Sequence, residues 1–343
     1  MNRRRSSASD KIRERRSLLG EHDVTIPSQK PGPFPRVAVS RCLLGETVRY
    51  DGGHKRNRLL TDRLSCGIEW IPLCPEVEAG LSVPREPMHL VGSTKAPRMV
   101  GVQSGMDLTQ AITTWARDRM RRLAREGVDG FVLKKGSPSC GLRGIPLYQP
   151  EGPPRRSGIG LFAAACLQAF PSVPAEDEGR LNDTDLLERF LIRVFAHYRW
   201  RQLQAGLVTR DALIRFHTRY KYLLLAHSPD HYRRLGRLIA DSKSLPLPTV
   251  VRIYGHMVMD ALARRATVNR HFNVLQHAMG YLVHRLTAAE RRALHDRLED
   301  YRSGSIPVSV PRALIHHYAR TVPIPYLLAQ YYFEPYPRQL QSA

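Results

Sequence analysis

Hydrophobic and polar positions follow two different patterns along the chain. From Pro35 onward, short apolar runs alternate with amphipathic segments. The runs predict three β-strands, at 37–40, 68–73 and 130–133. Apolar residues spaced at the helical period predict a crossover helix over 108–126, closed by Gly127, and a further helix is predicted at 160–170. Strands joined by crossover helices indicate an α/β domain with a Rossmann-like, mostly parallel sheet.

After about residue 181 the strand pattern ends, and long amphipathic stretches predict an all-α domain of six to eight helices. Plausible helix starts lie at Thr209, Ser228 with Pro229, Thr287 with Glu290 in capping-box spacing, and Pro311. The predicted organisation is a flexible basic tail at 1–33, an α/β domain at 34–180 and an all-helical domain at 181–343. Acidic residues within the tail disfavour the alternative of a mitochondrial presequence.

The net charge of the chain indicates which kind of binding partner to expect. The 343 residues include 53 Lys and Arg against 31 Asp and Glu, a net charge of +22, which favours a polyanionic partner over the alternative of a generally Arg-rich composition. The helical half alone holds 24 Lys and Arg against 12 Asp and Glu. No apolar run is long enough to span a membrane, and no signal peptide is recognised, so we expect a cytoplasmic protein.

Three of the five cysteines share one structural context. Cys42, Cys74 and Cys140 each lie at or just beyond the end of a predicted strand, in turns rich in Gly and Pro. The carboxyl ends of parallel strands meet at one sheet edge, so three thiols far apart in sequence could converge there. Three thiolates without a fourth ligand suit a 4Fe-4S cluster with one open iron better than structural zinc, and scattered core cysteines are the alternative. Cys66 and Cys166 lack this context.

Three ordered motifs around these cysteines carry a family resemblance. They run from Cys42-Leu-Leu-Gly45 to Gly53, from Cys74-Pro-Glu76 to Arg85, and along Lys135-Gly-Ser-Pro-Ser-Cys140. Residues 36–175 resemble the thiouracil desulfidases of the TudS-like family. Residues 190–325, including Phe216-His-Thr-Arg-Tyr-Lys221, resemble the YbgA-like domain fused behind it. The combination resembles the tRNA 4-thiouridine desulfidases of RudS type.

The resemblance implies a cofactor and a reaction. Cys42, Cys74 and Cys140 would ligate a 4Fe-4S cluster whose fourth iron binds the sulfur of a thiolated base in tRNA. The reaction would be hydrolytic and non-redox, with oxygen replacing sulfur. No DNA partner and no membrane partner are expected.

Addition of water and departure of sulfide both require proton transfer. The candidates beside the cysteines are Glu76, Ser137, Ser139 and Asp51. Each has a structural alternative: Glu76 could be paired with Arg85, the serines could shape the turn around Cys140, and Asp51 could be a turn residue.

RNA recognition calls for phosphate contacts and stacking surfaces. The candidates are Arg49 and Lys135 near the cysteines, and Arg199, Arg201, Arg219 and Lys221 in helical segments where arginine and aromatic residues interleave. The alternative places the aromatics in the bundle core with the arginines on a solvated face. His217, His227 and His231 are interpreted as packed or surface residues rather than metal ligands.

Other hypotheses remain open at this point. The substrate could be a free thiolated base or nucleoside, although the positive charge disfavours it. The protein could instead be a non-catalytic iron-sulfur protein that binds RNA or senses redox state, or a zinc-stabilised module.

Overall fold

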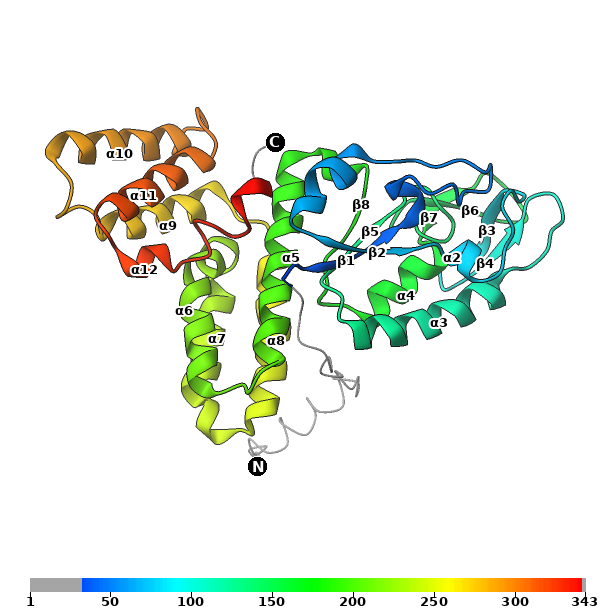
Figure 1. Ribbon diagram of the computed structural model, residues 1–343, viewed down its shortest axis with the longest axis horizontal. Coiled ribbons are helices and arrows are strands. Elements are labelled where there is room, and N and C mark those ends of the chain that lie inside the picture. Colours follow the sequence, from blue (N-terminus) through cyan, green and yellow to red (C-terminus); the bar gives the residue numbers. More distant parts are fainter. Residues whose placement is uncertain (1–32, 341–343) are drawn as a thin grey trace, which may run out of the picture.

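Figure 1 shows an α/β half and a helical half that meet along helix α5 (Thr184–Gln204). This computed structural model describes residues 33–340. The predicted basic tail therefore lies outside the described residues, apart from Pro33. Within the described range, no helix is both long and apolar enough to cross a bilayer.

The first sheet is entirely parallel, in the strand order β2-β1-β5-β8. Its strands are β1 (Arg36–Ser40), β2 (Glu69–Leu73), β5 (Gly130–Leu133) and β8 (Ala175–Asp177). The three predicted strands are confirmed, whereas β8 has no counterpart among them. The chain leaves β1 toward β2 on one side and returns to β5 on the other. Open α/β sheets bind ligands at the carboxyl ends of strands beside such a reversal.

Helices cover both faces of this sheet. Phe131 points to one face and shares a core with α3 (Thr109–Glu126) and α4 (Leu161–Ala169). Val132 points to the other face, where it belongs to the same core as Val194 of α5. The first helix of the helical half therefore supplies a layer of the α/β half.

Two glycines allow α5 to lie this close. A Cβ on Gly130 would lie 2.9 Å from Cγ2 of Val194. Gly127 ends α3 with a φ of +79°, as predicted for its helix-closing position, and a Cβ there would lie 2.9 Å from Nη1 of Arg201. A larger residue at either position would push α5 away from the sheet.

A second sheet is mixed, in the order β4-β3-β6-β7. Its strands are β3 (Met88–Ser93), β4 (Ala96–Gly101), β6 (Ile145–Tyr148) and β7 (Arg155–Gly158). Strands β3 and β4 form an antiparallel hairpin, and β3 pairs in parallel with β6. The hydrophobic pattern does not predict this sheet, because Pro97 and Pro146 interrupt the strand pattern and β7 is mostly exposed. The α/β fold class is nevertheless confirmed.

Eight α-helices follow in the described part of the helical half. They are α5, α6 (Arg210–His227), α7 (Pro229–Ala240), α8 (Leu247–Ala263), α9 (Val268–Gly280), α10 (Ala288–Arg302), α11 (Ser309–Thr321) and α12 (Pro325–Leu328). The predicted starts at Thr209, Ser228 and Thr287 are confirmed as N-caps, the last with a complete capping box. Pro311 lies within the first turn of α11 rather than at its start.

Candidate active site at the cysteine end of the parallel sheet

The structure brings the three predicted cysteines to one edge of the parallel sheet. Cys42 lies in the 3-10 turn directly after β1, Cys74 follows β2, and Cys140 lies in the turn after β5. The strands end flush, since Ser40 is in register with Leu73 and its Oγ accepts a hydrogen bond from the Lys134 backbone N–H at 3.0 Å. All three thiols are buried and free, with exposed fractions between 4% and 9%.

The three thiols interact electrostatically with one another. Burial and then the neighbouring Cys74 raise the pKa of the Cys42 thiol to about 11. Burial also raises the pKa of the Cys140 thiol far above its ordinary value, and Cys74 and Cys42 both add to this shift. Within residues 33–340, no group of three or more His, Cys, Asp or Glu side chains is arranged to hold a single metal ion.

A polar network lies against the third thiol. Ser139 is fully buried, and its Oγ lies 3.9 Å from the sulfur of Cys140 while donating a hydrogen bond to Oε1 of Glu76. The Ser137 hydroxyl lies 2.9 Å from that of Ser139 and accepts the backbone N–H of Cys140 at 3.1 Å. Glu76 in turn is paired through Oε2 with Arg85, whose Nε lies at 3.1 Å.

The structural alternatives for Glu76 and for the serines are observed, and beside them lie the contacts that a role in proton transfer would need. Glu76 is an ion-paired carboxylate, and its other oxygen contacts a hydroxyl that reaches the Cys140 thiol. Ser137 caps the turn around Cys140 and also contacts Ser139. The structure therefore provides a chain of proton donors and acceptors that ends at a cysteine.

Asp51 does not join this network. It is exposed, pairs with Arg49 at 3.1 Å and accepts the backbone N–H of Gly53 at 3.0 Å. The hydrogen bond from Arg49 is the main cause that lowers the pKa of the Asp51 carboxyl. The structure supports the alternative of a turn residue for Asp51, whose carboxylate is bonded to Arg49 and Gly53 rather than to the Glu76–Ser139 network.

Two cations lie within electrostatic range of Cys42, and both lower its pKa: Lys134 and Arg49. Arg49 was among the predicted residues, whereas Lys134 was not, although it follows the third predicted strand directly. Lys134 is ion-paired with Glu178, whose second oxygen accepts the backbone N–H of Lys135 at 2.7 Å. The side chain of Lys135 is exposed.

A pocket of about 520 Å³ adjoins the Glu76 network at Arg85. Its lining mixes apolar side chains with polar groups: Leu81, Ser82, Glu86, Met88, Gln103, Ser104, Met106 and Leu108. The pocket therefore offers both apolar surface and hydrogen-bonding groups beside the Glu76 network.

Among the predicted RNA-binding residues of the helical half, Arg201 needs a correction. It is 4% exposed and donates two hydrogen bonds to buried Asp129, so it has no surface to offer an RNA. Arg199 is half-buried, with its guanidinium 3.9 Å from the centre of the Tyr331 ring and a 2.7 Å bond to the Pro335 carbonyl. Arg219 is exposed and Lys221 half-buried, so these two keep accessible surface.

The aromatic residues between these arginines form the core of the bundle, as the structural alternative proposed: Tyr198, Trp200, Phe216 and Tyr220 are all buried. The three histidines considered above as metal ligands make hydrogen bonds within the helical half instead. His217 is bonded to Tyr254 at 3.1 Å, His227 to the Arg264 carbonyl at 2.6 Å, and His231 to Ser228 at 2.8 Å.

Comparison with known proteins places the chain in a family. Residues 37–178 match the model of the 2-thiouracil desulfurase family, and residues 221–337 match a domain of unknown function, DUF1722. The chain therefore belongs to the 2-thiouracil desulfurase family and carries DUF1722 behind that domain. It is by family an enzyme that removes sulfur from a thiolated base.

Two curated relatives are themselves uncharacterised. YbgA of Escherichia coli (strain K12) is 37% identical over 157 residues, which cover 44% of this chain and 93% of YbgA. YbbK of Bacillus subtilis (strain 168) is 32% identical over 155 residues, which cover 43% of this chain and 98% of YbbK. A solved structure, the [4Fe-4S]-dependent thiouracil desulfidase TudS, matches with 31% identity and a TM-score of 0.37, covering 45% of this chain and 97% of TudS.

Proposed function

We propose that the protein is a tRNA 4-thiouridine desulfidase that converts the thiolated base to uridine by hydrolysis, with a 4Fe-4S cluster held by Cys42, Cys74 and Cys140. The observation that carries the proposal is the meeting of three buried, mutually interacting thiols with the Ser139–Glu76 pair. The donor set fits such a cluster, because buried thiolates repel one another unless a cationic group lies between them.

When bound, a cluster with three protein thiolates supplies one iron without a protein ligand, which is a Lewis acid for the sulfur of the base. The net reaction takes up one water and releases hydrogen sulfide: the C=S bond becomes C=O, and both protons of the water end on sulfur. In this scheme Glu76 accepts the first proton from the water. The Ser139 hydroxyl passes a proton toward the departing sulfur, which its contacts with both Glu76 and Cys140 support.

Arg85 is a positioning residue in this scheme. Its Nε and Nη2 fix one oxygen of Glu76, and Nη2 also donates to the Val48 carbonyl at 3.0 Å. That carbonyl lies 4.0 Å from the sulfur of Cys74. Arg85 therefore ties the carboxylate to the backbone around a second thiol.

Charge beside the cysteines supports an RNA substrate over a free base. Arg143 and Arg180 pair with Glu176 at 2.9 and 3.0 Å, at the end of the same sheet. Arg193 of α5 lies within electrostatic range of Glu176. Arg143 and Arg180 share one carboxylate, whereas Lys134 is matched by Glu178, so the net positive charge lies at the end of β8 and on Arg193 of α5. This charge leads from the cysteine end of the sheet to the helical half and suits a phosphate backbone.

The test is desulfurisation by the full chain purified without oxygen. We expect a brown protein that converts 4-thiouridine in tRNA to uridine, measured by chromatography of the digested nucleosides. Alanine at Cys42, Cys74 or Cys140 should remove both iron and turnover, whereas the matched control Cys66→Ala, at the exposed cysteine, should keep both.

Three outcomes would contradict the proposal in different ways. An iron-free protein that still desulfurises tRNA would exclude the cluster. Faster turnover of free thiouracil or 4-thiouridine than of tRNA would replace the substrate but keep the enzyme. If Cys74→Ala retains both iron and turnover, Cys42, Cys74 and Cys140 do not hold the cluster together.

A further inference from the structure

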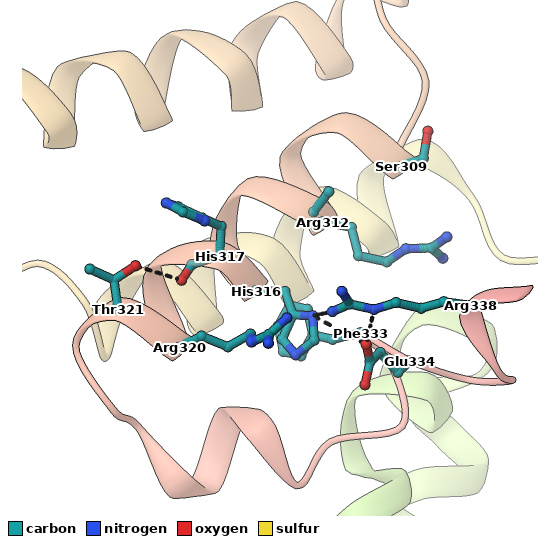
Figure 2. Close-up of a pocket in the computed structure, with 10 residues that line it drawn as sticks. Ser309, Arg312, His316, His317, Arg320, Thr321, Phe333, Glu334 and Arg338 are labelled. Carbon is teal, nitrogen blue, oxygen red and sulfur yellow. Dashed lines mark hydrogen bonds and ion pairs between the residues drawn. The ribbon is translucent and has the colours of Figure 1, made fainter. Parts of the chain in front are cut away.

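A second pocket, of about 690 Å³, lies in the helical half, and nothing in the proposed chemistry uses it. One wall is a face of α11, on which Arg312, His316 and Arg320 recur at helical spacing. The facing wall is the C-terminal segment, with Phe333 and Arg338 (Figure 2).

Positive charge dominates this pocket. Arg312 is largely buried and anchored to Glu188 of α5 at 2.8 Å. Arg338 is paired with Glu334, the one carboxylate among the residues that line the pocket. Arg320 is exposed and makes no hydrogen bond or ion pair with any other residue in the range 33–340. The pocket therefore offers a guanidinium free to bind an anion, with two more held in place beside it.

His316 lies between two of these guanidiniums. Figure 2 shows Arg320 and Arg338 reaching toward its ring from opposite sides. The ring is buried and stacked on Phe333, with centroids 5.7 Å apart and planes at 15°. Burial is the main cause that lowers the pKa of His316. Its Nδ1 lies 3.4 Å from Nη2 of Arg338 and 3.9 Å from Oε1 of Glu334, so the ring adds a third polar side chain to the group formed by Arg338 and Glu334.

We propose that this pocket binds a phosphate group of the RNA substrate. Guanidinium groups bind phosphate oxygens through paired N–H donors, and an arginine without a carboxylate partner is the one available for such a contact. The volume exceeds what a single small anion needs and admits a nucleotide. The choice of tRNA as the RNA rests on the proposed function.

The pocket is also fixed relative to the catalytic half. Arg338 begins the last turn, Arg338–Leu340, and Leu340 packs on Gly67, just before β2: its Cδ1 lies 2.9 Å from where a Cβ on Gly67 would be. A phosphate held by Arg338 is therefore held at a defined distance from the strand that leads to Cys74. This lets a contact far from the cysteines set the position of the substrate on the enzyme.

The test removes two cations from the pocket. The double variant Arg320→Ala/Arg338→Ala is compared with Arg117→Ala/Arg122→Ala, which removes two exposed, unpaired arginines from α3. Binding of 4-thiouridine-containing tRNA is measured by fluorescence anisotropy across a salt series. The pocket variant should bind about 10- to 100-fold more weakly at low salt, and its slope of log affinity against log salt should fall by about 1 to 2. The α3 variant should change far less.

Unchanged tRNA binding by the pocket variant would overturn the proposal. An equal loss of affinity in the α3 variant would also overturn it, because the loss would then follow from the lower net charge of the protein.

A second experiment titrates adenosine monophosphate. Suppose that the unaltered protein binds this nucleotide tightly, and that the pocket variant loses this binding but keeps its affinity for tRNA. The pocket would then be a site for a free nucleotide, and the proposal would be overturned. Arg320→Ala alone, at an exposed and unpaired position, repeats the test if the double variant misfolds. If the protein binds tRNA in the pocket but does not desulfurise it, the proposed function is refuted while the phosphate-binding pocket is still supported.

Discussion

Arg201 of α5 and Asp129, the residue before β5, form a buried ion pair that joins the two halves of the molecule. Nε of Arg201 lies 2.9 Å from Oδ1 of Asp129, and Nη2 lies 2.6 Å from Oδ2. The carboxylate also accepts the backbone N–H of Arg36 and contacts His197, each at 2.9 Å. Burial favours a higher pKa for Asp129, but these hydrogen bonds outweigh it and lower the pKa below its ordinary value. The charge is thus fully compensated inside the protein.

The first prediction removes one side of this pair. Arg201→Ala leaves a buried carboxylate without its main partner, so we expect the free energy of unfolding to fall by about 3–5 kcal/mol. The control Arg121→Ala breaks an exposed pair with Asp118 and should cost at most about 1 kcal/mol. Urea denaturation followed by circular dichroism measures both. Equal stability of the two variants would mean that the pair does not hold the halves together.

Local rules predicted much of the fold, and long-range contacts account for what they missed. Helix α3, strand β5 and the caps at Thr209 and Thr287 follow from spacing and capping within a few residues. The role of Arg201 does not follow from such local rules. Its place among aromatic residues resembles an RNA-binding surface, whereas its partner Asp129 lies 72 residues away in the sequence. Helical periodicity likewise identifies the apolar face of α5 but does not reveal that a sheet covers it.

The candidate site was predictable to the same extent. Strand ends identified the three cysteines, and motif position identified Glu76, Ser137 and Ser139. The contact between Glu76 and Ser139 spans 63 residues, and no local pattern encodes it. Asp51 stands in a motif too, but its neighbours Arg49 and Gly53 occupy its carboxylate. Motif membership therefore identified the region, and only the folded contacts separate the network from the turn.

The second prediction concerns proton transfer. Glu76→Gln keeps the shape and the contact to Ser139 but cannot accept a proton, so turnover should fall about 10²- to 10⁴-fold with the iron content unchanged. Ser139→Ala should give a loss of similar size, because it interrupts the same chain. Single-turnover assays with iron analysis separate catalysis from cofactor binding, and the exposed Glu151→Gln is the control. Near-normal turnover in Glu76→Gln would assign the carboxylate to structure alone.

The third prediction concerns acid stability of the helical half. Burial, with a smaller effect from Lys221, lowers the pKa of His217 to about 4. Burial is also the main cause that lowers the pKa of His271 to about 3. Both rings stay neutral in the folded protein, whereas the unfolded chain takes up protons near pH 6.5. Each residue therefore contributes fully above pH 6.5, and its contribution declines by about 1.4 kcal/mol per pH unit as the pH falls toward the folded pKa.

The measurement is urea denaturation at pH 7 and pH 5. His217→Gln/His271→Gln should lose part of the pH dependence that the unaltered protein shows, because glutamine does not titrate. His295→Gln, at an exposed histidine, should retain it. An unchanged pH dependence in the double variant would show that other groups control acid unfolding.

The fourth prediction compares two arginines of the helical half. Arg193 is half-buried and makes no ion pair or hydrogen bond with residues 33–340, and burial, then Arg189, lower its pKa. A partly desolvated cation that has no ion pair and only the more distant charge of Glu176 to compensate it is costly, and its guanidinium donors are not taken up by another side chain. Arg193→Met should therefore leave stability unchanged or raise it, while weakening the binding of tRNA. Arg312→Met should do the opposite to stability, with a loss of about 3 kcal/mol, because it leaves the half-buried carboxylate of Glu188 without its ion-pair partner.

Thermal unfolding and tRNA affinity measured on the same two preparations decide this comparison. If Arg193→Met is as unstable as Arg312→Met, then Arg193 is a structural residue. The positively charged surface that is proposed to run from the cysteines to the helical half would then not include Arg193. If its stability is kept and tRNA affinity is also unchanged, phosphate does not follow that surface. Weaker tRNA binding with unchanged turnover of free 4-thiouridine is the expected pair of results, since Arg193 contacts neither the thiols nor the Glu76 network.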